Sequence, residues 1–134
     1  MSILGYNEDQ VEKTKPIITI WAEENGIMKR GYRFGFGNGG HSENSGYTMM
    51  ADGKVLRMGI NSKKEKGPIL VMIVVDEVEQ QDYFIHLQDE ENTGYVTFSK
   101  PIEVKAGSVI NFVSMIDNSD ATMCVVSLIV ELDL

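Results

Sequence analysis

Short runs with a period of two residues recur along this chain, and dipeptides that favour tight turns separate them. Ile17 to Trp21 alternates between two faces, with Ile18 and Ile20 on the same side. Asn25-Gly26 and Asp52-Gly53 supply the positive φ angles that two-residue hairpins require. No apolar pattern sustains the helical period of 3.6 residues. These features predict an all-β fold.

Further runs of this kind continue to the C-terminus, and we expect about nine short strands after Pro16. Tyr32, Phe34 and Phe36 are expected on one face of a strand, and so are Leu56, Met58 and Ile60. Ile69 to Val75 lacks alternation, which is typical of a strand covered on both faces. Pro101 places the run after it at a sheet edge, because proline cannot donate to a ladder. Strands at this spacing predict a single antiparallel β-sandwich or jelly roll over residues 17–134, behind a polar arm at residues 1–16.

The balance of charge excludes several classes of partner. The chain has 20 acidic and 12 basic residues and a formal net charge of −8, which repels the phosphates of nucleic acid. Lys63, Lys64 and Lys66 form its one dense basic cluster, and we interpret them as part of a solvated loop. The longest apolar run is too short to cross a bilayer, and the polar N-terminus lacks the features of a signal peptide. We expect a protein that works in water without nucleic acid or membrane.

The final strand, expected over Thr122–Leu132 as the longest, has two partly apolar faces. Its even-numbered valines and leucines from Val126 lie on one face, and Val125, Ser127 and Ile129 lie on the other. One interpretation is that the second face meets something outside the monomer. The other is that the strand is central in a two-layer core. The pattern alone leaves both open.

The glycines and histidines give little evidence for a phosphate-binding or metal-binding site. Gly35, Gly37 and Gly40 have the spacing G-x-G-x-x-G, but no helix follows to hold a phosphate, so we expect a simple glycine-rich connection. His41 with Glu43 makes a weak metal candidate in a loop. We expect His86 to be a strand residue that faces solvent or an interface.

The cysteine and the carboxylates also give no indication of a catalytic site. Cys124 stands alone in an apolar run and is expected to be a buried hydrophobe. No Ser-His-Asp or Cys-His arrangement is visible, and the carboxylates gather at expected turns, including Asp89 to Asn92, which lacks the ligand alternation of a calcium loop. A glycoside hydrolase would need two carboxyls in a cleft, which sequence does not show. We therefore expect no enzyme, no catalytic residue, no cofactor and no metal.

Five stretches of the chain resemble a recurrent β-domain of tailed-bacteriophage structural proteins. They are Thr19–Glu24, Phe36–Gly39, Gly46–Met50, Gly53–Gly59 and Val126–Leu132. Such domains are similar to the trimeric jelly rolls of the tumour-necrosis-factor and C1q group, with the last strand near the threefold axis. The chain departs from the pattern at two places: Gly107-Ser108 stands where Gly-Asp is frequent, and Asp76-Glu77 stands where Asn-Gly is common.

The resemblance implies a homotrimeric structural protein of the virion, assembled in the cytoplasm of the host bacterium. It implies that Val125, Ser127 and Ile129 line a subunit interface near the threefold axis. No fibre shaft precedes the β-domain, which favours a capsid decoration protein or a short attachment protein whose arm docks on a larger capsid or tail protein. The alternative is a receptor-binding head that recognises a host surface glycan or protein, with Tyr32, Tyr47 or Tyr95 stacking on sugars.

Overall fold

The computed structural model describes residues 2–3, 6–7, 15–24, 28–36, 46–118 and 121–134 of the 134-residue chain. Throughout these residues the regular structure is entirely β, as predicted. The strands are β1 (Ser2–Ile3), β2 (Tyr6–Asn7), β3 (Ile17–Glu24), β4 (Gly35–Phe36), β5 (Tyr47–Thr48), β6 (Gly53–Lys64), β7 (Ile69–Val75), β8 (Val78–Leu87), β9 (Thr93–Val104), β10 (Val109–Ser114) and β11 (Ala121–Leu132).

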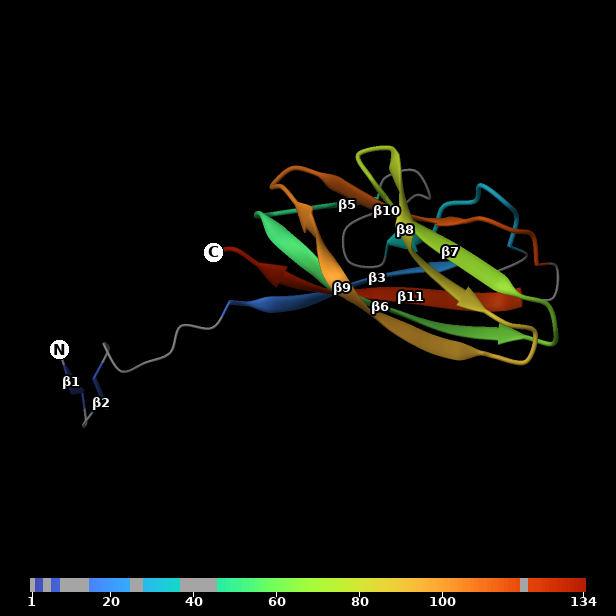
Figure 1. Ribbon diagram of the computed structural model, residues 1–134, viewed down its shortest axis with the longest axis horizontal. Coiled ribbons are helices and arrows are strands. Elements are labelled where there is room, and N and C mark those ends of the chain that lie inside the picture. Colours follow the sequence, from blue (N-terminus) through green and yellow to red (C-terminus); the bar gives the residue numbers. More distant parts are fainter. Residues whose placement is uncertain (1, 4–5, 8–14, 25–27, 37–45, 119–120) are drawn as a thin grey trace.

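Two antiparallel sheets pack face to face (Figure 1). The larger has the order β4-β3-β11-β6-β9 and the smaller the order β5-β10-β7-β8, while β1 pairs only with β2. The first long strand, β3, thus lies beside the last, β11, and β5 lies beside the next-to-last, β10. Strands that pair from the two ends of the chain inward form a jelly roll. The predicted sandwich or jelly roll is confirmed.

The inward faces of both sheets form one apolar core. On β11 every second residue points inward, and each of these is at most 2% exposed: Cys124, Val126, Leu128, Val130 and Leu132. Three phenylalanines join the sheets through ring contacts, with Phe36 stacked on Phe112 at a centroid distance of 5.2 Å and Phe34 edge-on to the same ring. Burial of this apolar surface, at about 25 cal/mol per Å², is the main force that holds the sandwich together.

The smaller sheet is buried on both sides of β7, as the unbroken apolar run predicted. Ile69, Val71 and Ile73 belong to the core. Met72 and Val74 point the other way, yet they are also buried. The segment before β4 extends this sheet, because Arg33 forms an isolated bridge with Val113 of β10. On the outer side of the smaller sheet, β7 is therefore buried, whereas Phe84 of β8, the partner of Met72 in the register, is 42% exposed.

The β7–β8 hairpin turns at Asp76 and Glu77, as predicted. Both residues have positive φ angles, 50° and 66°, which is the backbone of a type I′ turn made without glycine. Contacts outside the turn offset the strain. The Asp76 carboxylate accepts a hydrogen bond of 2.9 Å from the Val109 amide, and both carboxylate oxygens of Glu77 accept hydrogen bonds from the Arg33 guanidinium.

Several predicted boundaries were wrong, and pairing explains each. The shared face expected for Leu56, Met58 and Ile60 fails at Leu56, because a β-bulge between Val55 and Arg57 puts Val55 into the core instead. Strand β6 continues through Lys63 and Lys64, which were expected in a loop.

The other differences concern β9, β11 and Tyr32. Pro101 lies within the single strand β9, which is nevertheless an edge strand as expected. The final strand is no longer than β6 or β9, since each has 12 residues. Tyr32 lies before β4 and is 38% exposed, whereas Phe34 and Phe36 are buried. The Asn25-Gly26 turn lies outside the described residues.

Candidate functional site

The predicted interface residues lie on the side of the larger sheet that points away from the core, which we call the outer face. Strand β11 is central in that sheet, between β3 and β6, and its pairing determines which residues lie side by side there. Val125 lies between Glu23 and Asn61 in this register. Ser127 likewise lies between Trp21 and Gly59, and Ile129 between Thr19 and Arg57.

The structure brings Val125, Ser127 and Ile129 together in one row along β11. All three are half-buried, and the residues between them are fully buried in the core. The strand is central in its sheet, and one of its faces points away from the core. Contact of this row with another subunit stays a prediction.

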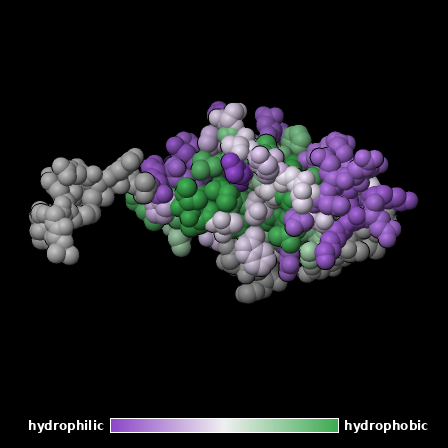
Figure 2. Space-filling view, turned by 90° about the horizontal axis from the view of Figure 1, so that it is seen from below, coloured by the Kyte–Doolittle hydropathy of each residue, from purple (hydrophilic) through white to green (hydrophobic). Residues whose placement is uncertain are grey.

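Large apolar side chains are exposed on the outer face. Ile17 is 60% exposed, Trp21 38% and Tyr95 73%. Figure 2 views the domain from the side of this sheet, and hydrophobic colour gathers toward the end where the chain enters β3, while hydrophilic colour covers the opposite end. On the outer side of the smaller sheet, Met72 and Val74 are buried and Phe84 is 42% exposed.

Charged side chains on the outer face are arranged in complementary positions. The Arg57 guanidinium lies 5.4 Å from the centroid of the Tyr95 ring, within the range of a cation–π contact. Its Nε also donates a 2.9 Å hydrogen bond to Thr97 Oγ1. Toward the end where β3 begins, Lys54 lies between Glu131 and Glu103 in the strand register. These contacts hold Arg57 and Tyr95 in fixed positions beside Gly59.

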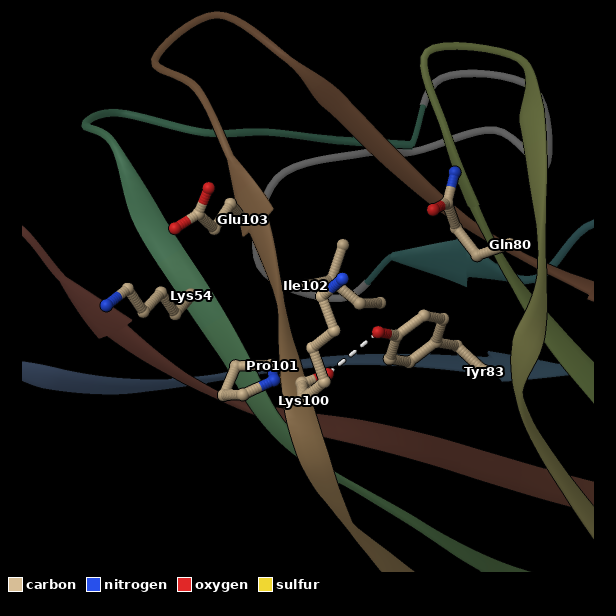
Figure 3. Close-up of a pocket in the computed structure, with 7 residues that line it drawn as sticks. All are labelled: Lys54, Gln80, Tyr83, Lys100, Pro101, Ile102 and Glu103. Carbon is tan, nitrogen blue, oxygen red and sulfur yellow. Dashed lines mark hydrogen bonds between the residues drawn. The ribbon is translucent and has the colours of Figure 1, made fainter.

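A second surface feature lies where edge strands β8 and β9 approach each other (Figure 3). It is an open hollow of about 390 Å³ lined by Lys54, Gln80, Tyr83, Lys100, Pro101, Ile102 and Glu103. The Tyr83 hydroxyl points across it and donates a 2.7 Å hydrogen bond to the Lys100 carbonyl. Tyr83 also packs edge-on against Phe98 at 4.9 Å. Tyr83 therefore ties the two sheets together at their open side.

This hollow does not have the arrangement of a glycoside hydrolase. Among the described residues that line it, Glu103 is the single carboxylate, whereas both mechanisms of glycoside hydrolysis need two carboxyls across the scissile bond. Lys100 and Glu103 are exposed to water, and Lys54 is half-buried.

Cys124 lies in the core, as predicted, and is fully buried. Burial, with the Glu24 carboxylate as the second cause, raises the pKa of its thiol to about 12. A thiol with such a pKa carries almost no thiolate at neutral pH, and the thiolate is the nucleophilic form. Cys124 therefore contributes packing and no chemistry.

The other candidate residues do not come together as a site. His86 is exposed on β8, as expected for a strand residue that faces outward. Gly37, Gly40, His41 and Glu43 lie outside the described residues. Within the described part of the chain, no three His, Cys, Asp or Glu side chains lie close enough together to hold a metal ion.

Comparison with known proteins adds no relative. No protein family model and no curated protein matches the chain. Among the described residues there is no helix that could span a membrane. Functional inference for this protein thus depends on its own sequence and structure.

Proposed function

We propose that this chain is a non-enzymatic structural protein of a tailed-phage virion. It acts as a homotrimeric capsid decoration protein or a short attachment protein, docked on a larger virion protein through its arm at residues 1–16. The virion role follows from the resemblance of the five stretches of the sequence. The observation that supports a contact surface is the outer face, where Ile17, Trp21 and Tyr95 are exposed around the half-buried row of β11. Large apolar side chains exposed on one face favour contact with a partner.

The charge of the outer face favours a second copy of the chain as its partner. The whole chain has a net charge of −8, so two copies repel each other at long range. Among the described residues of the outer face, however, cations and carboxylates are equal in number: Lys54, Arg57 and Lys63 against Glu23, Glu103 and Glu131. Association through this face therefore does not bring like net charges into contact.

The place where the N-terminal arm leaves the sandwich is suited to docking on a larger protein. The Pro16 carbonyl accepts a 2.8 Å hydrogen bond from the Leu132 amide, and Lys15 pairs with Asp133. The arm therefore joins the sandwich where β11 ends, at one end of the domain (Figure 1). In a trimer about an axis near β11, three arms leave from the same end. Three weak contacts to one larger protein then act together, and their combined affinity exceeds each alone.

Absolute mass in solution tests the proposal first. Light scattering coupled to size-exclusion chromatography should give three times the chain mass of 15.0 kDa. Particles that lack the protein should still adsorb to the host, with capsids that break more readily under heat or osmotic shock. A monomer at every concentration tested would overturn the trimer.

A receptor-binding head is the second candidate, and one observation favours it. Tyr95 is 73% exposed and Trp21 38%, and an exposed aromatic ring can pack against the apolar face of a sugar. Tyr47 is half-buried and its ring contacts Phe36. Loss of adsorption by particles without the protein would favour this function over decoration. Binding of host glycan by the isolated chain, removed by Tyr95→Ala, would support the same conclusion.

A further inference from the structure

Gly59 lies in the interior of the 12-residue strand β6, at a position where the outer face has its smallest side chains. Its neighbours in the register are Ser127 on β11 and Tyr95 on β9. Glycine in a strand interior is entropically unfavourable and often marks a place where another backbone or a ligand comes close. Gly59 therefore calls for a physical reason.

No such reason is found within the described chain. The φ angle of Gly59 is not in the left-handed region. A Cβ atom added there would lie 3.5 Å from Ser127 Oγ, 3.8 Å from the Gly94 carbonyl oxygen and 4.0 Å from Tyr95 Cβ, all ordinary contact distances. Alanine would fit without strain.

Two other strand glycines show the contrast. A Cβ at Gly53 would lie 2.6 Å from the Glu131 carbonyl oxygen, which no real structure tolerates. A Cβ at Gly94 would lie 3.0 Å from Leu87 Cδ2. Gly53 is required by close packing against backbone inside the monomer, whereas at Gly94 the end of the Leu87 side chain would have to move by a few tenths of an ångström. Gly59 has room for a Cβ, as Gly35 of β4 also has. What distinguishes Gly59 is its place on the outer face, between the exposed side chains of Trp21 and Tyr95.

The surroundings of Gly59 indicate what approaches it. Trp21 and Tyr95 stand at the two ends of the row that contains Ser127 and Gly59. They are three strands apart, which is roughly 14 Å at the backbone. Two large aromatic side chains thus lie on either side of the small residues Ser127 and Gly59. We call these four residues the Gly59 site.

We infer that the Gly59 site receives an apolar side chain of a neighbouring copy of this chain, and that Gly59 is the residue that sets how closely the copies approach. This inference rests on the proposed homo-oligomer. A second copy fits because the charges of the face balance, and because the chain carries exposed apolar side chains of the right size elsewhere, Met50, Val78 and Phe84 among them.

The experiment compares Gly59→Leu with Gly59→Ala and with Gln81→Leu, an exposed position on β8 that controls for the added leucine. A leucine at residue 59 points into the space that the neighbour would occupy, and overpacking of a close contact is destabilising. We expect Gly59→Leu to raise the dissociation constant of the oligomer about 100-fold, and the two other variants to change it less than about threefold. Circular dichroism and thermal unfolding check that the variant monomer is folded.

A second measurement uses the wild-type protein alone. Trp21 is the single tryptophan, so the fluorescence emission of the protein reports how far the Gly59 site is exposed to water. Dilution through the dissociation constant should shift this emission to the red as Trp21 becomes exposed to water.

The outcomes separate the two proposals. An oligomer that Gly59→Leu leaves intact, with Trp21 emission independent of dilution, overturns the inference and leaves the proposed trimer standing. A wild-type monomer overturns both. A monomer whose Trp21 emission responds to host saccharide shows that the occupant is a glycan and not a second copy.

Discussion

Replacement of Ile129 by lysine separates the stability of the sandwich from its association. Ile129 is half-buried on the outer face, between Thr19 and Arg57 in the strand register. In the monomer a lysine there keeps its stem on the sheet and its ammonium in water. In an oligomer built on this face, the same ammonium is taken out of water beside the cation of Arg57.

The two costs differ enough to be distinguished. Half of the burial of an isoleucine side chain contributes about 1 kcal/mol, and a like-charge pair across strands costs up to about 1 kcal/mol more. The monomer therefore loses about 1–2 kcal/mol of a typical 5–15 kcal/mol and stays folded. An uncompensated charge in the interface costs about 3–5 kcal/mol for each subunit, which is at least a 100-fold change in dissociation constant.

Light scattering should then show a fall from three chain masses to the single mass of 15.0 kDa, with an unchanged circular dichroism spectrum. Ile129→Val, which keeps the β-branched apolar surface, serves as the matched control and should remain trimeric. If Ile129→Lys keeps the mass of the wild-type oligomer, the β11 row is not in the interface and the reasoning fails.

Three further predictions concern groups inside the monomer. Among the described residues, neither side-chain polar atom of the buried Asn111 has a hydrogen-bond partner. Asn111→Leu should therefore raise the free energy of unfolding, measured by urea denaturation, by about 1–2 kcal/mol. A lower free energy of unfolding would show that the amide has a partner. The Arg33 side chain, through its hydrogen bonds, lowers the pKa of the Glu77 carboxyl below its ordinary 4.5. Glu77 therefore contributes stability that is fully present above pH 4.5 and lost as pH falls through the lower pKa, and the stability difference between wild type and Glu77→Gln should shrink over that range. Cys124, with its thiol pKa at about 12, should react with iodoacetamide at pH 8 only as fast as the protein unfolds, measured by mass spectrometry.

The sequence was sufficient for the fold because its period of two matches the burial pattern of the long strands. The pattern predicted Ile18 and Ile20 on one face of β3 and Trp21 on the other, and the structure turns the first face to the core. The bulge at Leu56 could not be foreseen, because it depends on how β6 pairs with β11 and β9 at once. Sequence periodicity describes a single strand, whereas this bulge depends on the pairing of three neighbouring strands.

The candidate site was only partly predictable for a similar reason. Val125, Ser127 and Ile129 could be assigned to one face from β11 alone. That Trp21 and Tyr95 flank Gly59 could not, since these residues are far apart in the chain and meet only through the register of four strands. The exposure of Tyr95 likewise follows from its place on an edge strand of the assembled sheet.

The edges of the two sheets strengthen the case for association through the outer face. Sheet edges are the usual alternative route to self-association, because their unpaired backbone groups can add another strand. Here β4 and β5 are edge strands of two residues each, and β9 carries Pro101 with an irregular register beside it. On β8, Tyr83 engages the Lys100 carbonyl of β9 and joins the two edges. Short, interrupted or bridged edges disfavour strand addition, so the exposed apolar residues of the outer face are the better explanation for how copies of this chain would meet.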